Sequence, residues 1–364
     1  MKIVFIFDSL AESETHRYLL EEIFFLRAQD IDARVVTLAE EDPKNTLWSE
    51  TLFTKENFTA VPIPKLWKFP DWKKLRLHLE YEMPDLVITY GAKADLCGRV
   101  VAKLAKVPIK LFVFAHDLAD IRKRTKFYDD ILSHVTDRYI VTTEEAKIAL
   151  SKLEVSPKKI AVLRDGIDLG KYGIPPTHEI RSSLGISNDE FVFTFIGELL
   201  PEKNVPVILR ALVKLQRGRL VIVGDGPEMK SLALLAEGLE LKDRVVIKDK
   251  YFDIPGLLAV SDAMILTSKA EPEFPIILVL GLASGLPVIA TDFPGVEKVI
   301  QKDVNGLIVR QQDSFELARV MEELMSNAQL YETLKKNTRN DLAQYSLATH
   351  AAKLLALAQE RPGK

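Results

Sequence analysis

Short runs of apolar, mostly β-branched residues recur along this chain, and longer segments with the spacing of amphipathic helices separate them. Most of these runs are apolar throughout rather than alternating, which is typical of strands in a parallel sheet covered by helices on both faces. The pattern therefore predicts the α/β class. We expect one series of strands at 3–7, 33–37, 86–89, 111–114, 139–141 and 160–163, and a second at 191–196, 220–223, 245–247, 263–266, 288–290 and 307–309.

Two series of strands predict two doubly wound domains, each built on a Rossmann-like sheet. A chain of 364 residues is long enough to form two separate hydrophobic cores. The stretch YGIPPTHE at 172–179 lies between the two series, and its paired prolines are typical of a linker. We therefore expect an N-terminal domain over residues 1–170 and a C-terminal domain over residues 171–344.

Composition argues against several classes of function. Apolar residues make up 47% of the chain and charged residues 28%, a mixture typical of globular proteins. The formal net charge of −3 lacks the positive excess that nucleic-acid binding requires. The single cysteine, Cys97, excludes an internal disulfide and a cysteine-based metal cluster, and we expect it to be a small buried side chain.

The N-terminal segment MKIVFIFDSL predicts a first strand rather than a signal peptide. Its apolar run ends at Asp8, which is too early for the apolar core of a signal peptide, and no small-residue cleavage site follows. No stretch reaches the eighteen or so apolar, uncharged residues that a membrane span requires. We therefore expect a cytoplasmic protein.

In parallel sheets, ligands bind beyond the carboxyl ends of the strands, so the loops that follow strands are the places to look for chemistry. Gly197 and Lys203 follow the strand at 191–196, and a cation near a helix start can help to hold a phosphate. Gly224 and Gly226 follow the next strand, in the sequence GDGPEMKSL. Both loops also have a structural interpretation, because lysines are common near helix starts and Gly-Pro turns join many strands to helices.

A third loop leads into the apolar stretch of KAEPEFPIILVLGLASGLPVIATD, which spans residues 269–292. Residues 276–284 predict a helix too apolar to face water, and Gly285 ends it. Glu271 and Glu273 would then lie at the positive end of a buried helix, where carboxylates are stabilised and can accept hydrogen bonds from sugar hydroxyls. The alternative is a pair of exposed acids that cap a structural helix.

The stretch EPEFPIILVLGLASGLPVIATDFPGVEKVI, followed by NGLIV, resembles the signature of the large retaining glycosyltransferase family 4 (glycosyl transferases group 1), of GT-B architecture. The resemblance covers nearly the whole chain. Five further stretches are similar to motifs of the same family: SETHRYLLEEIFFLRAQDIDARVVTL, FAHDLADI, AVLRDGIDLGKY, GELLPEKN and LVIVGDGPEMKSL. Any one of them is a weak signal, but together and in the right order they are specific.

The resemblance implies a nucleotide-sugar donor bound in a cleft between two domains, mostly by the C-terminal one, and transfer with retention at the anomeric carbon. It implies that Lys203 holds the diphosphate, that Glu271 and the backbone of residues 274–276 hold the donor sugar, and that His116 lies over that sugar. It also implies a last helix, 345–360, that returns to the N-terminal domain, and no metal ion or organic cofactor. The implied catalytic residues are His116 and Glu271, and the implied donor-binding residues are Gly197, Lys203, Gly224, Gly226, Glu273, Phe274, Pro275 and Ile276.

The chain departs from the family pattern at three places. Glu198 stands where the family usually has an arginine beside the diphosphate, and a carboxylate about 4 Å from a phosphate oxygen would cost up to roughly 4 kcal/mol. Leu280 stands where a second glutamate of the family binds the nucleotide ribose. Glu273 is an extra residue before Phe274, and Pro275 replaces a glycine, so either Glu271 or Glu273 could contact the sugar.

Two segments of the N-terminal half combine basic and aromatic residues, at 65–81 and 120–130. Such a combination suits contact with an anionic bilayer, and hence a lipid-linked acceptor. The alternative is a solvated helix face with long side chains lying along it. The residues expected on this acceptor or membrane side are Trp67, Trp72, Arg122 and Arg124.

Two functions of different classes fit these observations. The first is a glycosyltransferase that moves a sugar from a nucleotide-sugar to a glycan or a lipid-linked acceptor, with no nucleic-acid partner. The second is a catalytically impaired GT-B scaffold that serves as a binding subunit of an active partner glycosyltransferase. Glu198 and Leu280 favour the scaffold, whereas His116, Lys203 and Glu271 favour the enzyme.

Overall fold

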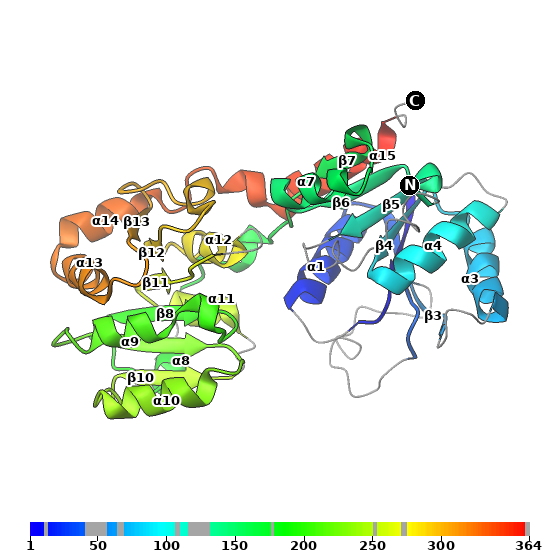
Figure 1. The fold of residues 1–364 in the computed structure, drawn as a ribbon. Helices are drawn as coiled ribbons and strands as arrows, with labels where there is room; N and C mark the ends of the chain where they lie inside the picture. Colours follow the sequence, from blue (N-terminus) through cyan, green and yellow to red (C-terminus); the bar gives the residue numbers. More distant parts are fainter. Residues whose placement is uncertain are drawn as a thin grey trace. The chain divides into compact units, whose positions relative to one another are not determined.

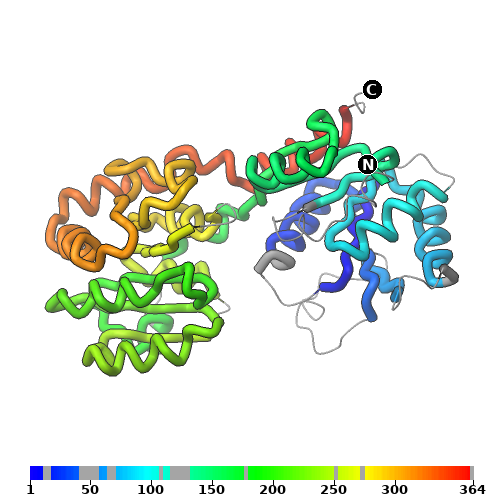
Figure 2. The backbone as a smooth tube through the Cα atoms, viewed as in Figure 1, coloured from blue at the N-terminus to red at the C-terminus, as the bar shows by residue number. Residues whose placement is uncertain are grey.

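The structure is a computed structural model that describes residues 1–10, 14–40, 57–63, 69–105, 110–115, 132–175, 178–249, 253–270 and 275–360. The chain packs into two units, one formed by Met1–Ile167 with Gln344–Lys364 and the other by Asp168–Ala343. Each unit is a parallel sheet flanked by helices (Figure 1), and the path of the chain through each unit can be followed in Figure 2. The domain ends expected from the sequence, residues 170 and 344, lie within three residues of these boundaries.

The first unit has a seven-stranded sheet in the order β3-β2-β1-β4-β5-β6-β7, and all its paired strands are parallel. The central strands are buried along nearly their whole length, which explains why most of their residues are apolar. The strands are β1 (Lys2–Phe7), β2 (Asp32–Thr37), β3 (Phe58–Ala60), β4 (Leu86–Tyr90), β5 (Lys110–Ala115), β6 (Arg138–Val141) and β7 (Ile160–Val162).

Successive side chains of β1 enter different cores, as the pleat of a strand requires. Phe5 belongs to a core with helices α1 (Glu14–Ala28) and α15 (Leu347–Gln359). Ile6 belongs to a core on the other face, with α3 (Phe69–Glu82) and α4 (Ala92–Leu104). Helix α7 (Glu144–Lys152) packs against β6 and β7. The last helix therefore completes the core of the first unit.

The second unit has a six-stranded sheet in the order β10-β9-β8-β11-β12-β13, again parallel. Helix α9 packs against both α10 and α13, and α12 packs against β11 and β12. The strands are β8 (Val192–Ile196), β9 (Arg219–Val223), β10 (Val245–Lys248), β11 (Ala263–Leu266), β12 (Val288–Thr291) and β13 (Gly306–Val309), and the helices are α8 (His178–Ser183), α9 (Pro206–Leu212), α10 (Met229–Gly238), α11 (Ile254–Ala259), α12 (Ile276–Ala283), α13 (Ser314–Ser326) and α14 (Ala328–Asn337).

The α/β class and every strand expected from the sequence are confirmed. The sequence analysis missed β3, because this three-residue edge strand is only half-buried and carries no continuous apolar run. Cys97 is buried, as expected. Within the described parts of the chain, no helix has the length and apolar character needed to cross a membrane.

Candidate functional site at the carboxyl edge of the second sheet

The strand order of the second sheet reverses between β8 and β11, which lie side by side. From β8 the chain proceeds outward through β9 and β10, and from β11 it proceeds the other way through β12 and β13 (Figure 1). Such a switch point leaves a crevice at the carboxyl ends of the two central strands, where ligands of open α/β sheets bind. The loops that follow β8, β9 and β11 all begin at this edge of the sheet.

The three glycines predicted at this edge allow two loops to touch backbone to backbone. A Cβ atom on Gly224 would lie 1.8 Å from the carbonyl oxygen of Gly197, and one on Gly226 would lie 2.5 Å from that of Leu199. The amide of Leu199 donates to Asp225 O at 2.8 Å, so the loops continue the pairing of β8 with β9. Gly224 and Gly226 are required for this close approach, whereas a Cβ atom on Gly197 would make only ordinary contacts.

Lys203 ends a 3₁₀ turn, η4 (Pro201–Lys203), just beyond the glycine loop. Asn204 follows in the left-handed conformation with φ of 54°, which an asparagine tolerates better than most residues. The hydroxyl of Thr267, directly after β11, donates to Lys203 O at 2.9 Å and to Asn204 O at 3.2 Å. Hydrogen bonds therefore join the turn that carries Lys203 to the loop that follows β11.

The segment 267–269 is joined to loops on both sides. Its Lys269 amide donates to Glu202 O at 2.8 Å, and Thr291, at the end of β12, donates its hydroxyl to Ser268 O at 2.6 Å. The side-chain amide of Gln311, which follows β13, donates to Lys269 O at 2.9 Å. These hydrogen bonds hold the backbone of residues 267–269, which precedes the loop at 271–274.

Helix α12 begins directly after that loop, with buried Pro275 at its N-cap and half-buried Ile276 as its first residue. Leu280 is 1% exposed, which confirms the expected burial. A Cβ atom on Gly281 would lie 2.7 Å from the sulfur of Met264, so the helix packs closely on β11. An acid at position 280 would enter an apolar interior, and this explains why the helix has no polar side chain before Ser284.

Several predicted site residues lie outside the described residues: His116, Glu271, Glu273, Phe274, Trp67, Arg122 and Arg124. Trp72 is described, and its expected place on a membrane-facing surface is corrected by its burial. Its indole is 9% exposed and packs with Leu75 and Leu79 in the core between α3 and the sheet. Interleaved basic residues suggest a surface position for the aromatic residues of 65–81, but the helical spacing of 72, 75 and 79 places these three in the core.

At the carboxyl edge of the first sheet, a carboxylate of the protein itself binds the first turn of a helix. Asp8, the residue after β1, accepts hydrogen bonds from the backbone amides of Lys93 and Ala94, the first turn of α4. Burial raises the pKa of Asp8, although these two hydrogen bonds and the charge of Lys93 act in the opposite direction. The Lys93 ammonium donates to Leu38 O and Ile63 O, which follow β2 and β3. The place that a phosphate takes in many such folds is therefore occupied by Asp8.

A buried charged pair, which the sequence analysis missed, joins the last helix to the first. His350 Nε2 of α15 lies 3.1 Å from the Glu22 carboxylate of α1, and His350 Nδ1 lies 2.7 Å from Arg164 O. Burial alone would lower the pKa of His350, but the Glu22 carboxylate and the Arg164 carbonyl raise it to about 9. The helical spacing of apolar residues in the sequence can show that Glu22 and His350 each face the interior, but it cannot show that they contact each other.

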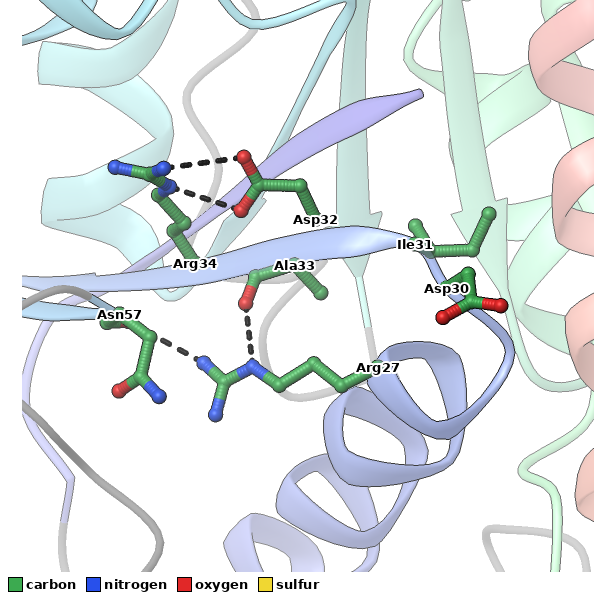
Figure 3. Close-up of a pocket in the computed structure, with 7 residues that line it drawn as sticks. All are labelled: Arg27, Asp30, Ile31, Asp32, Ala33, Arg34 and Asn57. Atoms are coloured by element: carbon green, nitrogen blue, oxygen red, sulfur yellow. Dashed lines mark hydrogen bonds and ion pairs between the residues drawn. The ribbon is translucent and has the colours of Figure 1, made fainter.

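A hollow of about 360 Å³ lies at the amino end of β2 (Figure 3). Arg27 spans it, and its guanidinium donates to Ala33 O at 2.6 Å and to Asn57 O at 3.3 Å. Arg34 forms a two-pronged pair with Asp32. Since this edge is opposite to the carboxyl ends of the strands and its cations bind the protein itself, the hollow is a structural feature of the sheet edge.

Comparison with known proteins agrees with this geometry. Residues 176–341 match the family "Glycosyl transferases group 1", and residues 15–171 match "Glycosyltransferase Family 4". The chain is 29% identical over 284 residues to the UDP-Gal:alpha-D-GlcNAc-diphosphoundecaprenol alpha-1,3-galactosyltransferase of Escherichia coli, covering 72% of each protein. It is 26% identical over 272 residues to the N-acetyl-alpha-D-glucosaminyl L-malate synthase of Bacillus anthracis, covering 73% of this chain and 69% of that protein.

Among solved structures, HepE of Anabaena in complex with UDP matches 98% of this chain and 99% of its own, with a TM-score of 0.79 at 22% identity. This likeness extends over both units. The two family matches together reach from residue 15 to residue 341. The chain belongs to the group 1, family 4 glycosyltransferases and has the GT-B fold.

Proposed function

We propose that this glycosyltransferase moves a sugar, with retention at the anomeric carbon, from a nucleoside diphosphate sugar to a lipid-linked or other glycan acceptor. The observation that carries the proposal is the convergence, by direct hydrogen bonds, of the loops after β8, β9 and β11 at the switch point of the second sheet. The names of two relatives support it. The Escherichia coli enzyme uses UDP-Gal and a diphosphoundecaprenol-linked acceptor, and HepE was crystallised with UDP.

In this proposal the donor lies at the carboxyl edge of the second sheet, with its diphosphate beside Lys203. As the bond between the anomeric carbon and the diphosphate oxygen breaks, negative charge grows on that oxygen, and the Lys203 ammonium group stabilises it. The acceptor hydroxyl oxygen forms the new bond on the same face of the sugar, and its proton leaves with the diphosphate. We propose that Glu271 and the backbone of residues 274–276 bind the sugar and that His116 takes part in catalysis, as the family resemblance implies. We propose that neither a metal ion nor an organic cofactor takes part.

The reaction can be tested directly. Thermal-shift screening of nucleotide-sugars will find the donor, because a ligand that binds only the folded protein raises its melting temperature. NMR of the product formed on a polyprenyl diphosphate sugar should show the same anomeric configuration as the donor. Lys203→Ala should lower kcat/KM by about a hundredfold, the loss expected for a charged hydrogen bond in the transition state. A product of inverted configuration would refute the retaining mechanism.

The ribose side of the donor site lacks a carboxylate on α12, since Leu280 is buried there. Two lost hydrogen bonds to a charged group weaken binding a hundredfold or more, so UDP, GDP and ADP should bind with Kd of about 100 μM or weaker. Leu280→Glu should tighten one of them, provided that calorimetry shows the variant still folded. Submicromolar binding by the unmodified protein would show that another residue makes the ribose contact.

The same observation favours a second candidate, a scaffold that supports a partner glycosyltransferase without using a donor itself. Leu280 stands where the family has a glutamate that binds the ribose, and Glu198 stands where it usually has an arginine beside the diphosphate. The two candidates differ in one measurement. If neither the unmodified protein nor Leu280→Glu is stabilised by any nucleotide or nucleotide-sugar, the scaffold function replaces the enzyme.

We propose, finally, that the first unit touches a membrane surface through helix α3 from the cytoplasmic side. Four residues on one side of this helix are exposed: Lys73, Lys74, Leu77 and Tyr81, the tyrosine at 82%. Two cations beside apolar side chains suit an anionic bilayer. The protein should sediment with vesicles that contain phosphatidylglycerol and not with phosphatidylcholine vesicles, and Lys73→Glu with Lys74→Glu should abolish the difference. Equal sedimentation with both lipids would refute this contact.

A further inference from the structure

We propose that Lys269 is a second diphosphate-binding residue of the donor site and acts together with Lys203. The inference rests on the proposed function, because it assigns a further contact to the same donor. Lys269 follows β11, whereas Lys203 follows β8, so the two lysines reach the switch point from adjacent strands.

The backbone places the two lysines side by side. The amide of Lys269 donates to Glu202 O at 2.8 Å, next to Lys203, and the hydroxyl of Thr267 donates to Lys203 O at 2.9 Å. The two lysine-bearing loops are therefore in direct contact. Since a lysine carries its ammonium group on a flexible four-carbon stem, both ammonium groups can reach one diphosphate placed over this contact.

The position of Lys269 is also held from the opposite side. The Gln311 amide donates to Lys269 O at 2.9 Å, and Thr291 fixes the preceding carbonyl of Ser268. A backbone held at successive residues loses little further entropy when its side chain binds a ligand. Lys269 itself is exposed and has no ion-pair partner in the described part of the chain.

The charges at this edge explain why a second cation is needed. The loop after β8 brings two exposed carboxylates, Glu198 and Glu202, together with Lys203. With two carboxylates and one ammonium group, these three side chains offer a diphosphate no net positive charge. Arg310, after β13, is committed elsewhere, because its guanidinium pairs with Glu316 at 2.9 Å and with Asp313 at 2.8 Å. Lys269 supplies the positive charge that the loop after β8 lacks.

The proposal is tested by measuring how much each phosphate adds to binding. UDP, GDP and ADP are titrated by calorimetry, together with the corresponding monophosphates and nucleosides. For the diphosphate that binds best, Lys269→Ala should weaken binding about tenfold, and Lys269→Arg less than threefold. The same Lys269→Ala change should alter binding of the nucleoside less than twofold, and it should reduce the dependence of diphosphate binding on salt.

Two variants serve as controls. Lys203→Ala should also lose diphosphate affinity, whereas Lys242→Ala should not, since this exposed lysine precedes β10 at the amino edge of the same sheet. Unchanged diphosphate affinity in a folded Lys269→Ala variant would overturn the proposal and leave the proposed function intact. If the unmodified protein binds none of the three diphosphates, the donor site itself fails, and the proposal fails with it.

Discussion

Gly224 cannot carry a side chain, because its Cβ atom would overlap the carbonyl oxygen of Gly197 at 1.8 Å. Its φ of 157° is also one that side chains rarely adopt. Gly224→Ala should therefore force the two loops apart and destabilise the second unit by at least about 2 kcal/mol. Chemical denaturation monitored by circular dichroism would measure the loss.

Gly238 provides the matched control in the same unit. It is the last residue of α10, and a Cβ atom there meets nothing within 4 Å. Gly238→Ala should leave stability unchanged or raise it by up to about 1 kcal/mol, because alanine is the better helix former. If both alanine variants unfold at the same denaturant concentration, the close backbone contact at Gly224 has no energetic importance.

At the scale of the secondary-structure elements, hydrophobic pattern and position along the chain were sufficient for most of the prediction. The apolar runs identified every strand of the two sheets except β3, and the rule that ligands bind after strands identified Gly197, Lys203 and Gly224 at one edge. Contacts between distant elements could not be read in this way. Gln311 reaches Lys269 only because β13, β12 and β11 are neighbours in the sheet, an order that no local pattern reveals.

The docking of α15 on α1 depends on a charged pair, and we expect it to depend on pH. The pKa of His350 is raised to about 9 in the folded protein, against about 6.5 when unfolded. Its contribution to stability is therefore fully present below about pH 6.5 and is lost as the pH rises through about 9. The loss should amount to about 3 kcal/mol at most. The groups that face His350 are Glu22 of α1, the Arg164 carbonyl and Asp165.

Denaturation of the first unit at a series of pH values between 6 and 10 tests this expectation. His350→Gln should be less stable than the unmodified protein at pH 7 and should lose the decline toward alkaline pH. His134→Gln, which changes an exposed histidine of the 3₁₀ turn η1 (Ser133–Val135), should keep that decline. A decline that persists unchanged in His350→Gln would have to come from another group.

On the scale of the whole molecule, the two units differ in how the chain builds them. The second unit uses one continuous segment, Asp168–Ala343, whereas the first unit needs the last residues of the chain to complete its core. Leu347, Ala351, Leu354 and Ala358 of α15 are all buried. Arg138 pairs with Glu360 at 2.6 Å, and Lys110 donates to the Ala358 and Glu360 carbonyls. Losing this packing should cost the first unit on the order of 5 kcal/mol.

Because a typical domain is stable by only about 5–15 kcal/mol, removal of residues 344–364 should unfold most or all of the first unit. Residues 168–343 should fold alone, since the sheet, helices and core of the second unit all come from that segment. Hydrogen exchange would separate the two units. In the shortened chain, the amides of β1, β4 and β5 should lose protection, whereas those of β8, β9 and β11 should keep it. Protected β1 and β4 amides in a chain that ends at residue 343 would show that the first sheet is stable without α15.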